Sequence, residues 1–305
     1  MIPNTLEAVE AALHDQHYVA DRSLVVAIHL ALQLQRPLFL EGEAGVGKTE
    51  VAKTLAAILG EDLIRLQCYE GLDVAQALYE WDYARQMLAI RLIEARQDGS
   101  HPDVHDIMSR DYLVARPLLQ AIERGARGEH SVLLIDELDR ADEEFEAYLL
   151  ELLSDFQVTI PEVETVRAVV PPVVVITSNR TREIHDALKR RCFYYWVDYP
   201  NAERELEILR VRAPGMSEAL SAELVGFVQE LRKLDLFKLP GVAETIDWAE
   251  ALVQLDRTDL DSGTIDDTLG ILLKYQDDIA RIQGSEANRI LRQVKSELGA
   301  AGTGE

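Results

Sequence analysis

The sequence predicts an α/β fold with a buried parallel sheet, followed by a segment that contains only helices. Short aliphatic runs alternate with amphipathic helical patterns as far as residue 200, which is typical of a sheet covered by helices on both faces. A glycine-rich loop, Gly42–Thr49, lies between the first of these runs and the helix that follows it. Beyond Asn201 only helical periodicity recurs. We therefore expect a domain boundary near residue 200.

The N-terminal part of the chain predicts helices, then a strand, a loop and another helix. Residues 1–36 have apolar side chains at helical spacing and are expected to cover the sheet. Pro37–Leu40 predicts a short buried strand, and Glu50–Leu59 predicts an amphipathic helix behind the loop. A second strand is expected at residues 62–67.

The segment after the second expected strand has a less regular pattern of apolar residues. A helical run is expected from Arg85 to Arg96, and the polar stretch Gln97–Arg110 predicts a loop. Pro117 suits the first turn of a helix that runs to about Arg124, because its fixed φ and missing N–H are tolerated there.

Three further strands complete the expected sheet. Ser131–Ile135 is a continuous apolar run, as expected for a strand buried on both faces. A helix with one apolar stripe follows at about residues 142–156. Val158–Ala168 predicts a hairpin, and the last two strands are expected at residues 173–177 and 193–197.

The C-terminal third predicts a helical domain over residues 201–298. Residues 299–305 are rich in glycine and small side chains and are expected to form a flexible tail. The helices of this domain are expected at residues 203–211, 217–234, 245–255 and, with breaks, 264–298.

Composition narrows the class of protein. The chain has 305 residues, a formal net charge of −23 and 48% hydrophobic residues. This charge argues against nucleic acid as a partner, because nucleic-acid binding requires a cationic surface. No apolar run approaches the ~20 residues of a membrane span, and no signal peptide is visible. The two cysteines, Cys68 and Cys192, fit a cytoplasmic protein better than a disulfide framework.

The loop after the first strand carries the most specific motif of the chain. Gly42–Thr49 matches G-x-x-x-x-G-K-[ST], the phosphate-binding loop, at every fixed position. Its glycines allow successive backbone N–H groups to face one anion, and the helix N-terminus adds a positive dipole end. Lys48 is expected to reach the β- and γ-phosphates of ATP, and Thr49 to offer its hydroxyl to Mg²⁺.

Polar residues follow two of the buried strands. Asp136 and Glu137 end the strand at 131–135, which is the Walker B arrangement. Asp136 would hold Mg²⁺, and Glu137 would polarise the water that attacks the γ-phosphate. Asn179 follows the strand at 173–177, where its amide could orient that water or could simply form a turn. Ligands of open parallel sheets bind at this carboxyl edge.

These features, in this order and together with an Arg-Cys box and a helical lid, resemble an AAA+ ATPase. Ile135–Ala141 (I-D-E-L-D-R-A) is similar to the I-D-E-I-N-R-A string of the MoxR family, and Leu149–Glu151 with Gln157–Ile160 matches its L-L-E and Q-V-T-I. Several further strings resemble the CoxD branch of that family: Gln67–Asp73, Tyr79–Trp81, Leu188–Cys192 and Glu244–Trp248.

The resemblance implies a P-loop core with a five-stranded parallel sheet, residues 1–200, and an all-helical lid. It places a helix 2 insert near residues 70–83 and a presensor hairpin near residues 157–168. Tyr79, Trp81 and Tyr83 would contact a client protein or pack within the insert.

Site residues follow from the resemblance one by one. Asn179 would be sensor 1, Arg191 the arginine finger that reaches the neighbouring subunit, with Arg190 as its rival, and Arg140 a second trans contact. The loop would bind ATP through all of its residues: Gly42, Glu43, Ala44, Gly45, Val46, Gly47, Lys48 and Thr49. Many AAA+ lids carry a sensor 2 arginine, but Gly241–Thr245 offers none.

The family resemblance also implies a hexameric ring, a partner with a von Willebrand factor A domain, and a metalloenzyme client such as the molybdenum hydroxylase carbon monoxide dehydrogenase. The first hypothesis is therefore a Mg²⁺-dependent ATPase that matures this client. The alternatives are a nucleotide-dependent binding switch with little turnover, which the missing sensor 2 arginine favours, and a DNA-handling AAA+ protein, against which the net charge of −23 argues.

Overall fold

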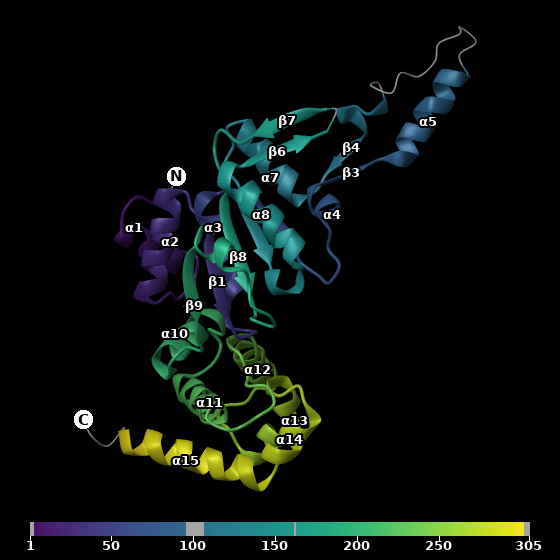
Figure 1. The fold of residues 1–305 in the computed structure, drawn as a ribbon. Helices are drawn as coiled ribbons and strands as arrows, with labels where there is room; N and C mark the ends of the chain where they lie inside the picture. The colour runs from purple at the N-terminus through teal and green to yellow at the C-terminus, as the bar shows by residue number, and fades with distance from the viewer. Residues whose placement is uncertain (1–2, 96–106, 162, 302–305) are drawn as a thin grey trace. The chain divides into compact units, whose positions relative to one another are not determined.

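The computed structural model describes residues 3–95, 107–161 and 163–301. Most of the loop expected at residues 97–110 therefore lies outside the described part. The chain divides into two compact units, which we describe separately (Figure 1). The core unit contains residues up to 196 except 17–19 and 42–48, and these two segments group with the residues from 197 onward in the helical unit.

A five-stranded sheet forms the centre of the fold. Its strand order is β2-β5-β8-β1-β9, and the pairs β2–β5, β5–β8 and β8–β1 are parallel. This confirms the predicted α/β fold with its parallel sheet and following helices. The strands span, in chain order, β1 Leu38–Gly42, β2 Leu63–Gln67, β5 Val132–Asp136, β8 Val173–Ser178 and β9 Phe193–Val197.

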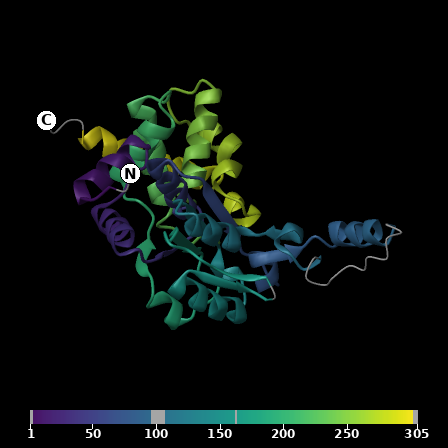
Figure 2. The ribbon, with the colours of Figure 1, turned by 90° about the horizontal axis from the view of Figure 1, so that it is seen from above.

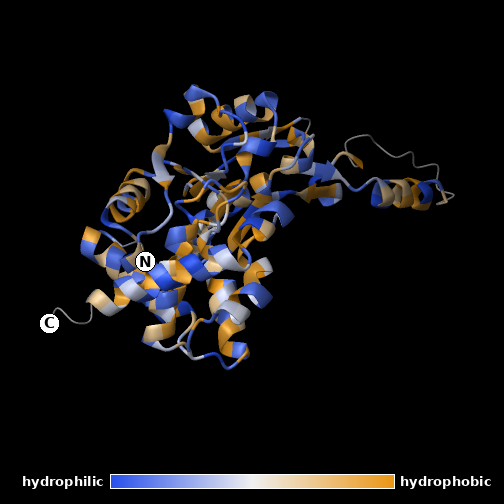
Figure 3. Ribbon diagram, turned by 90° about the horizontal axis from the view of Figure 1, so that it is seen from below, coloured by the Kyte–Doolittle hydropathy of each residue, from blue (hydrophilic) through white to orange (hydrophobic). Residues whose placement is uncertain are grey.

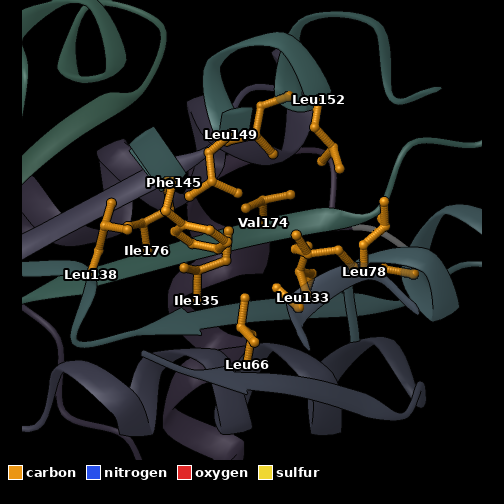
Figure 4. Packing of buried hydrophobic residues seen from close by; sticks show 14 of the residues in the cluster. Leu66, Leu78, Leu133, Ile135, Leu138, Phe145, Leu149, Leu152, Val174 and Ile176 are labelled. Atoms are coloured by element: carbon orange, nitrogen blue, oxygen red, sulfur yellow. The ribbon is translucent and has the colours of Figure 1, made fainter. Parts of the chain in front are cut away.

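The central strands are buried on both faces. Every residue of β5 is buried, and Leu133 and Ile135 belong to the hydrophobic cluster that also contains residues of α8. Figure 4 shows Phe145, Leu149 and Leu152 of α8 (Glu143–Asp155) pointing toward the sheet. The apolar stripe predicted for this helix therefore faces the core. Asp142 caps α8 by accepting the N–H of Phe145 at 2.8 Å.

Other helices of the core unit follow the predicted order. Asp21 caps α2 and Pro117 begins α7, as the chemistry of helix starts favours. The bounds of these helices are α1 Leu6–Asp15, α2 Arg22–Leu34, α3 Lys48–Leu59, α4 Val74–Leu78, α7 Pro117–Ala126 and α9 Asp186–Lys189.

An arm extends from the sheet of the core unit. Strands β3 (Tyr79–Trp81) and β4 (Leu113–Ala115) pair antiparallel at its base, and helix α5 (Tyr83–Glu94) lies beyond them. Figures 1 and 2 both show α5 pointing away from the sheet. The inserted structure thus continues well past residue 83, because β3 finds its partner strand more than 30 residues later.

Helix α5 exposes apolar side chains. Tyr83, Met87, Leu88 and Leu92 are each more than half exposed. Figure 3 shows hydrophobic residues along this helix at the end of the arm. A short 3₁₀ turn, η1 (Arg110–Tyr112), leads back into β4. Trp81 and Tyr79 are only partly exposed and contact each other edge to face.

A hairpin forms where the sequence predicts one. Strands β6 (Gln157–Ile160) and β7 (Glu164–Arg167) pair antiparallel, with Gln157 opposite Arg167. Their inward residues Val158, Ile160 and Val166 join the core of the sheet. A second 3₁₀ turn, η2 (Leu138–Arg140), connects β5 with α8.

The helical unit has its own hydrophobic core. Trp248 is fully buried at its centre, contacts Phe227, and donates its indole N–H to Thr268 at 2.8 Å. The helices are α10 Ala202–Arg212, α11 Glu218–Leu231, α12 Val242–Gln254, α13 Ser262–Leu272, α14 Gln276–Ile282 and α15 Ser285–Ala301.

Two expected boundaries in this unit differ. Helix α12 begins three residues before Thr245, because Glu244 reaches back to the N–H of Gly241 at 3.0 Å and stabilises an earlier start. Helix α15 continues to Ala301 instead of ending in a tail from Gly299, since alanines favour helix strongly enough to carry it past that glycine. Within the described residues, no helix combines the length and apolarity of a membrane span.

Candidate active site

The glycine-rich loop joins β1 to α3. Gly45 and Gly47 have φ values of +79° and +93°, which glycine adopts without strain. The Lys48 ammonium donates to the carbonyls of Gly42 and Glu43 at 2.8 and 2.5 Å. These bonds curl the loop around the amine, and the helix behind it begins at Lys48. This geometry fits a phosphate group held by backbone N–H groups and one ammonium.

Within the helical unit, the start of α12 packs against the loop. The N–H of Ala243 donates to the carbonyl of Gly45 at 3.1 Å. A Cβ on Gly45 would come within 2.8 Å of a carboxylate oxygen of Glu244. The residue of α12 beside the loop is therefore an acid, in the region where the sequence offers no sensor 2 arginine.

The core unit brings together two oxygen ligands at the edge of the sheet. Thr49, in the first turn of α3, donates its hydroxyl to Asp136 at 3.1 Å. Asp136 is the last residue of β5 and is only 2% exposed. A hydroxyl and a carboxylate side by side fit a small hard cation such as Mg²⁺, which prefers oxygen ligands. Asp136 ends β5, and Thr49 follows the loop after β1; the two lie at one edge because the carboxyl ends of these parallel strands coincide.

Two further residues hold Asp136. Thr177, at the end of β8, donates its hydroxyl to one carboxylate oxygen at 2.6 Å and accepts the N–H of Glu137 at 2.9 Å. Arg65, on β2, donates to the other carboxylate oxygen at 2.6 Å and to Gln67 at 2.5 Å. The Walker B carboxylate is thus fixed from both neighbouring strands.

Glu137 occupies an unusual backbone conformation. Its φ of +54° lies in the left-handed region, which costs of order 1 kcal/mol for a residue with a side chain. Its carboxylate contacts the Arg140 guanidinium at 2.8 Å, through a turn of η2. Arg140, expected as a contact to a neighbouring subunit, is therefore paired within its own chain in this structure.

Asp139 ties the Walker B turn to the Asn179 loop. Its carboxylate accepts the N–H of Asn179 at 3.1 Å, the N–H of Thr181 at 2.9 Å and the Thr181 hydroxyl at 2.7 Å. Burial raises the pKa of Asp139, but the donors from Thr181 and Asn179 outweigh it, so that its pKa lies below the usual value. The loop that carries Asn179 is consequently anchored to a charged residue.

The arginine pair, Arg190 and Arg191, directly follows α9. Arg190 is highly exposed, and its guanidinium lies 3.7 Å from Asp186. Arg191 donates to the carbonyl of Leu150 at the C-terminal half of α8. Both border an open hollow of about 610 Å³ between α8 and α9, which Glu151 and Asp155 also line.

A comparison with protein-family models assigns the chain to a family. The family described as AAA domain (dynein-related subfamily) matches residues 37–192, just over half of the chain and all of the site residues from the glycine-rich loop to the arginine pair. The chain belongs to this AAA family.

Relatives of this AAA protein are distant in sequence. A Staphylococcus haemolyticus protein without a described function is 23% identical over 250 residues, which cover 80% of this chain and 85% of the relative. A Staphylococcus aureus relative, also without a described function, is 24% identical over 227 residues and is covered to 77%.

Solved structures match this chain only at low similarity. A protein from Cytophaga hutchinsonii, described provisionally as an ATPase, is 16% identical with a TM-score of 0.47, with 95% of this chain and 93% of that chain covered. The RuvB Holliday junction branch migration motor of Thermotoga maritima is 15% identical with a TM-score of 0.45, with 88% and 72% covered.

Sequence analysis missed three residues of the AAA site: Thr177, Arg65 and Asp139. A signal existed for two of them. Thr177 precedes Ser178 and Asn179 at the end of a buried strand, and Asp139 stands where the MoxR string has Asn. Arg65 gives no such signal, because a charged residue in an exposed register of a strand is ordinary.

Proposed function

We propose that this AAA protein is a Mg²⁺-dependent ATPase that acts as an oligomeric ring. The contact between Thr49 and Asp136 supports this most directly, because it joins the Walker A and Walker B residues at one edge of the sheet. Glu137 follows Asp136 at once, which supplies a base beside the two oxygen ligands. A nucleotide-binding role alone would not require that base.

Each residue of the site then has a role. Lys48 and the N–H groups of Gly42–Thr49 would bind the phosphates of ATP, and Thr49 and Asp136 would hold Mg²⁺, which would neutralise phosphate charge. Glu137 accepts a proton from the attacking water at a carboxylate oxygen. To do so it leaves the Arg140 guanidinium, which now lies 2.8 Å away. Asn179 orients the water.

The arginines act in trans in this proposal. An arginine stabilises the charge that develops on the transferred phosphoryl group, and a neighbouring subunit supplies it in a ring. Arg191 matches the family position, and Arg190 is the more open of the two in the structure. A hexamer brings each exposed end of α9 to the site of the next copy.

We further propose a chaperone-like role in the cytoplasm, in which the ring matures a metalloenzyme such as a molybdenum hydroxylase together with a von Willebrand factor A domain protein. The MoxR-like string Ile135–Ala141 and the CoxD-like strings support this role. The apolar outer side of α5 offers a surface for such a client. Proteins trapped on the Glu137→Gln variant with ATP, identified by mass spectrometry, test it; recovery of no metalloenzyme contradicts the client assignment.

The Glu137→Gln variant also tests the chemistry. We expect ATP binding near the wild-type level, with turnover reduced on the order of 100-fold or more, because the amide cannot accept the proton. Glu143→Gln is the matched control, since Glu143 is an exposed residue at the start of α8. Wild-type turnover in Glu137→Gln would contradict the assignment.

The second candidate is a binding switch with little turnover. The Glu137–Arg140 ion pair favours it, because the guanidinium holds the carboxylate at 2.8 Å and Glu137 has to leave this contact before it can face a water. Turnover per subunit, measured over a range of protein concentrations, separates the two functions. A ring with a trans arginine gains specific activity as it assembles, whereas a switch shows low activity at every concentration.

A further inference from the structure

An ion pair with a buried carboxylate joins β1, the strand before the glycine-rich loop, to the segment that carries Arg190 and Arg191 in the same chain. Glu41 directly precedes Gly42, and its side chain is 3% exposed. The Lys189 ammonium contacts both of its carboxylate oxygens, at 2.9 and 3.2 Å. The Tyr194 hydroxyl donates to the same carboxylate at 2.9 Å. Lys189 is the last residue of α9, immediately before Arg190 and Arg191.

The surroundings of this pair restrict its motion. The Lys189 ammonium lies 5.6 Å from the ring centroids of both Phe39 and Tyr194, so two aromatic faces flank it. Phe39 is fully buried in β1. The buried Glu41 carboxylate is stable only with its partner, because an unpaired buried ion is strongly disfavoured. Lys189, whose side chain is 27% exposed, is held beside Glu41 as that partner.

A second contact holds the backbone of the arginine pair. Arg36, which precedes β1, donates to the carbonyl of Arg190 at 2.7 Å and to the carbonyl of Arg191 at 3.0 Å. Its guanidinium also lies over the ring of Phe193, 4.9 Å from the centroid. The segment is thus fixed on both sides of β1, by Arg36 before the strand and by Glu41 at its end.

We propose that Lys189, held by Glu41, is a positioning residue for the arginines that a subunit offers to its neighbour. Strand β1 leads into the glycine-rich loop of a subunit's own site. In this proposal the same strand fixes the arginine pair that the subunit offers to the site of its neighbour. This inference rests on the proposed trans role of Arg190 and Arg191, and it adds the residues that set their position. A displacement of about 1 Å in such a group can reduce turnover 100-fold.

The Lys189→Met variant removes the charge and keeps a long apolar stem. We expect kcat to fall on the order of 10- to 100-fold, while the affinity for a fluorescent ATP analogue stays within about twofold, because the finger acts in the transition state. The Glu41→Gln/Lys189→Met double variant guards against misfolding, since it leaves no unpaired buried charge. It is expected to fold and to show the same loss of kcat.

Mixed rings give the deciding measurement. Lys189→Met subunits keep an intact site, and Glu137→Gln subunits keep an intact arginine segment. In a ring randomly mixed from equal amounts, about half of the interfaces pair the two variants. About a quarter combine the site of a Lys189→Met subunit with the arginines of a Glu137→Gln subunit, so activity should rise well above that of either variant alone. A purely structural or same-subunit role of Lys189 predicts no gain on mixing, and that result overturns the inference.

A control separates this inference from the proposed function. Arg190→Ala/Arg191→Ala subunits mixed with Glu137→Gln subunits should show the same gain. If this control pair gains activity and the Lys189→Met pair does not, the arginines act in trans but Lys189 does not position them. If neither pair gains activity, the trans role itself is wrong, and the inference that rests on it is wrong as well.

Discussion

Thr177 donates its hydroxyl to Asp136 across 2.6 Å, between neighbouring strands at the edge of the sheet. The pairing of Ile135 with Ile176 brings the two residues side by side. The same hydroxyl oxygen accepts the N–H of Glu137 at 2.9 Å. One buried side chain therefore positions both acidic residues of the Walker B pair.

Replacing Thr177 with Val should destabilise the protein by about 1–3 kcal/mol, because the change removes one donor from the buried Asp136 carboxylate and leaves the N–H of Glu137 without its acceptor. Urea unfolding measures the difference. Thr159→Val is the matched control: Thr159 lies on the hairpin, and its hydroxyl contacts only the exposed Thr165 at 3.2 Å among the described contacts. An equal, small effect of both changes would show that the Thr177 hydroxyl contributes little.

Asp139→Asn should destabilise the protein near neutral pH. The destabilisation should become smaller in acid. The donors of Thr181 and Asn179 lower the pKa of Asp139 in the folded state below its unfolded value. The stabilisation from the ionised form is therefore complete above the unfolded pKa of about 3.9 and is lost as pH falls through the folded pKa. The stability gap between wild type and variant should thus be constant from about pH 5 to 7 and shrink below pH 4.

Thermal unfolding at a series of pH values checks the Asp139 prediction. Asp247→Asn serves as the control, because Asp247 is exposed on α12. A stability gap that does not shrink as the pH falls below the unfolded pKa of about 3.9 would contradict the assigned role of its charge.

Arg65→Gln should increase the apparent affinity for Mg²⁺. The guanidinium lies 2.6 Å from a carboxylate oxygen of Asp136 and competes there with a cation. The readout is the Mg²⁺ concentration at half-maximal thermal stabilisation, in the Glu137→Gln background with saturating ATP. Arg127→Gln, which removes a surface contact with Glu129, is the control. A higher midpoint in Arg65→Gln would show that Arg65 supports cation binding instead of opposing it.

Arg232→Met should destabilise the helical unit strongly. Arg232 is 7% exposed and bonds Glu205, whose side chain is fully buried, at 2.7 Å. Breaking such a pair costs about 3–5 kcal/mol, because one charge stays buried without its partner. The Glu205→Gln/Arg232→Met double variant should recover part of this loss, since no ion then stays unpaired.

Arg210→Met is the matched control for Arg232→Met in the same unit. Arg210 contacts Glu218 at 3.0 Å, but both side chains are more than half exposed. An exposed pair of this kind contributes little to stability, because solvent screens its charges. Denaturant unfolding of the three variants compares the two ion pairs, and similar losses in Arg210→Met and Arg232→Met would contradict the predicted effect of burial.

The fold could be predicted from local patterns because each strand of the sheet is short, aliphatic and buried. Ser131–Ile135 and Val173–Thr177 differ from the observed strands by one residue at each end or less. The arm was not predictable in the same way. Its base depends on the pairing of Glu80 in β3 with Val114 in β4. No local pattern in either strand predicts a partner so far along the chain.

The residues of the site also fall into two groups: those that a sequence motif predicts, and those that only tertiary packing places. Gly42–Thr49, Asp136 and Glu137 could be identified because their chemistry requires particular residue types at fixed spacing. Arg65 and Lys189 could not, since a lone charged residue in a strand or helix is usually a solvated one. Their structural roles depend on the carboxylate that each one contacts. Arg65 contacts Asp136, and Lys189 contacts Glu41.

The class of fold and the residues expected to face a phosphate and a cation follow from the sequence alone, because glycine conformations, aliphatic runs and terminal carboxylates are local properties. The way these residues are held depends on tertiary packing. Parallel pairing places Thr177 and Arg65 on Asp136, and folding of α9 against β1 places Lys189 on Glu41. These contacts join residues far apart in the chain, and their strength comes from burial, which no single segment of sequence contains.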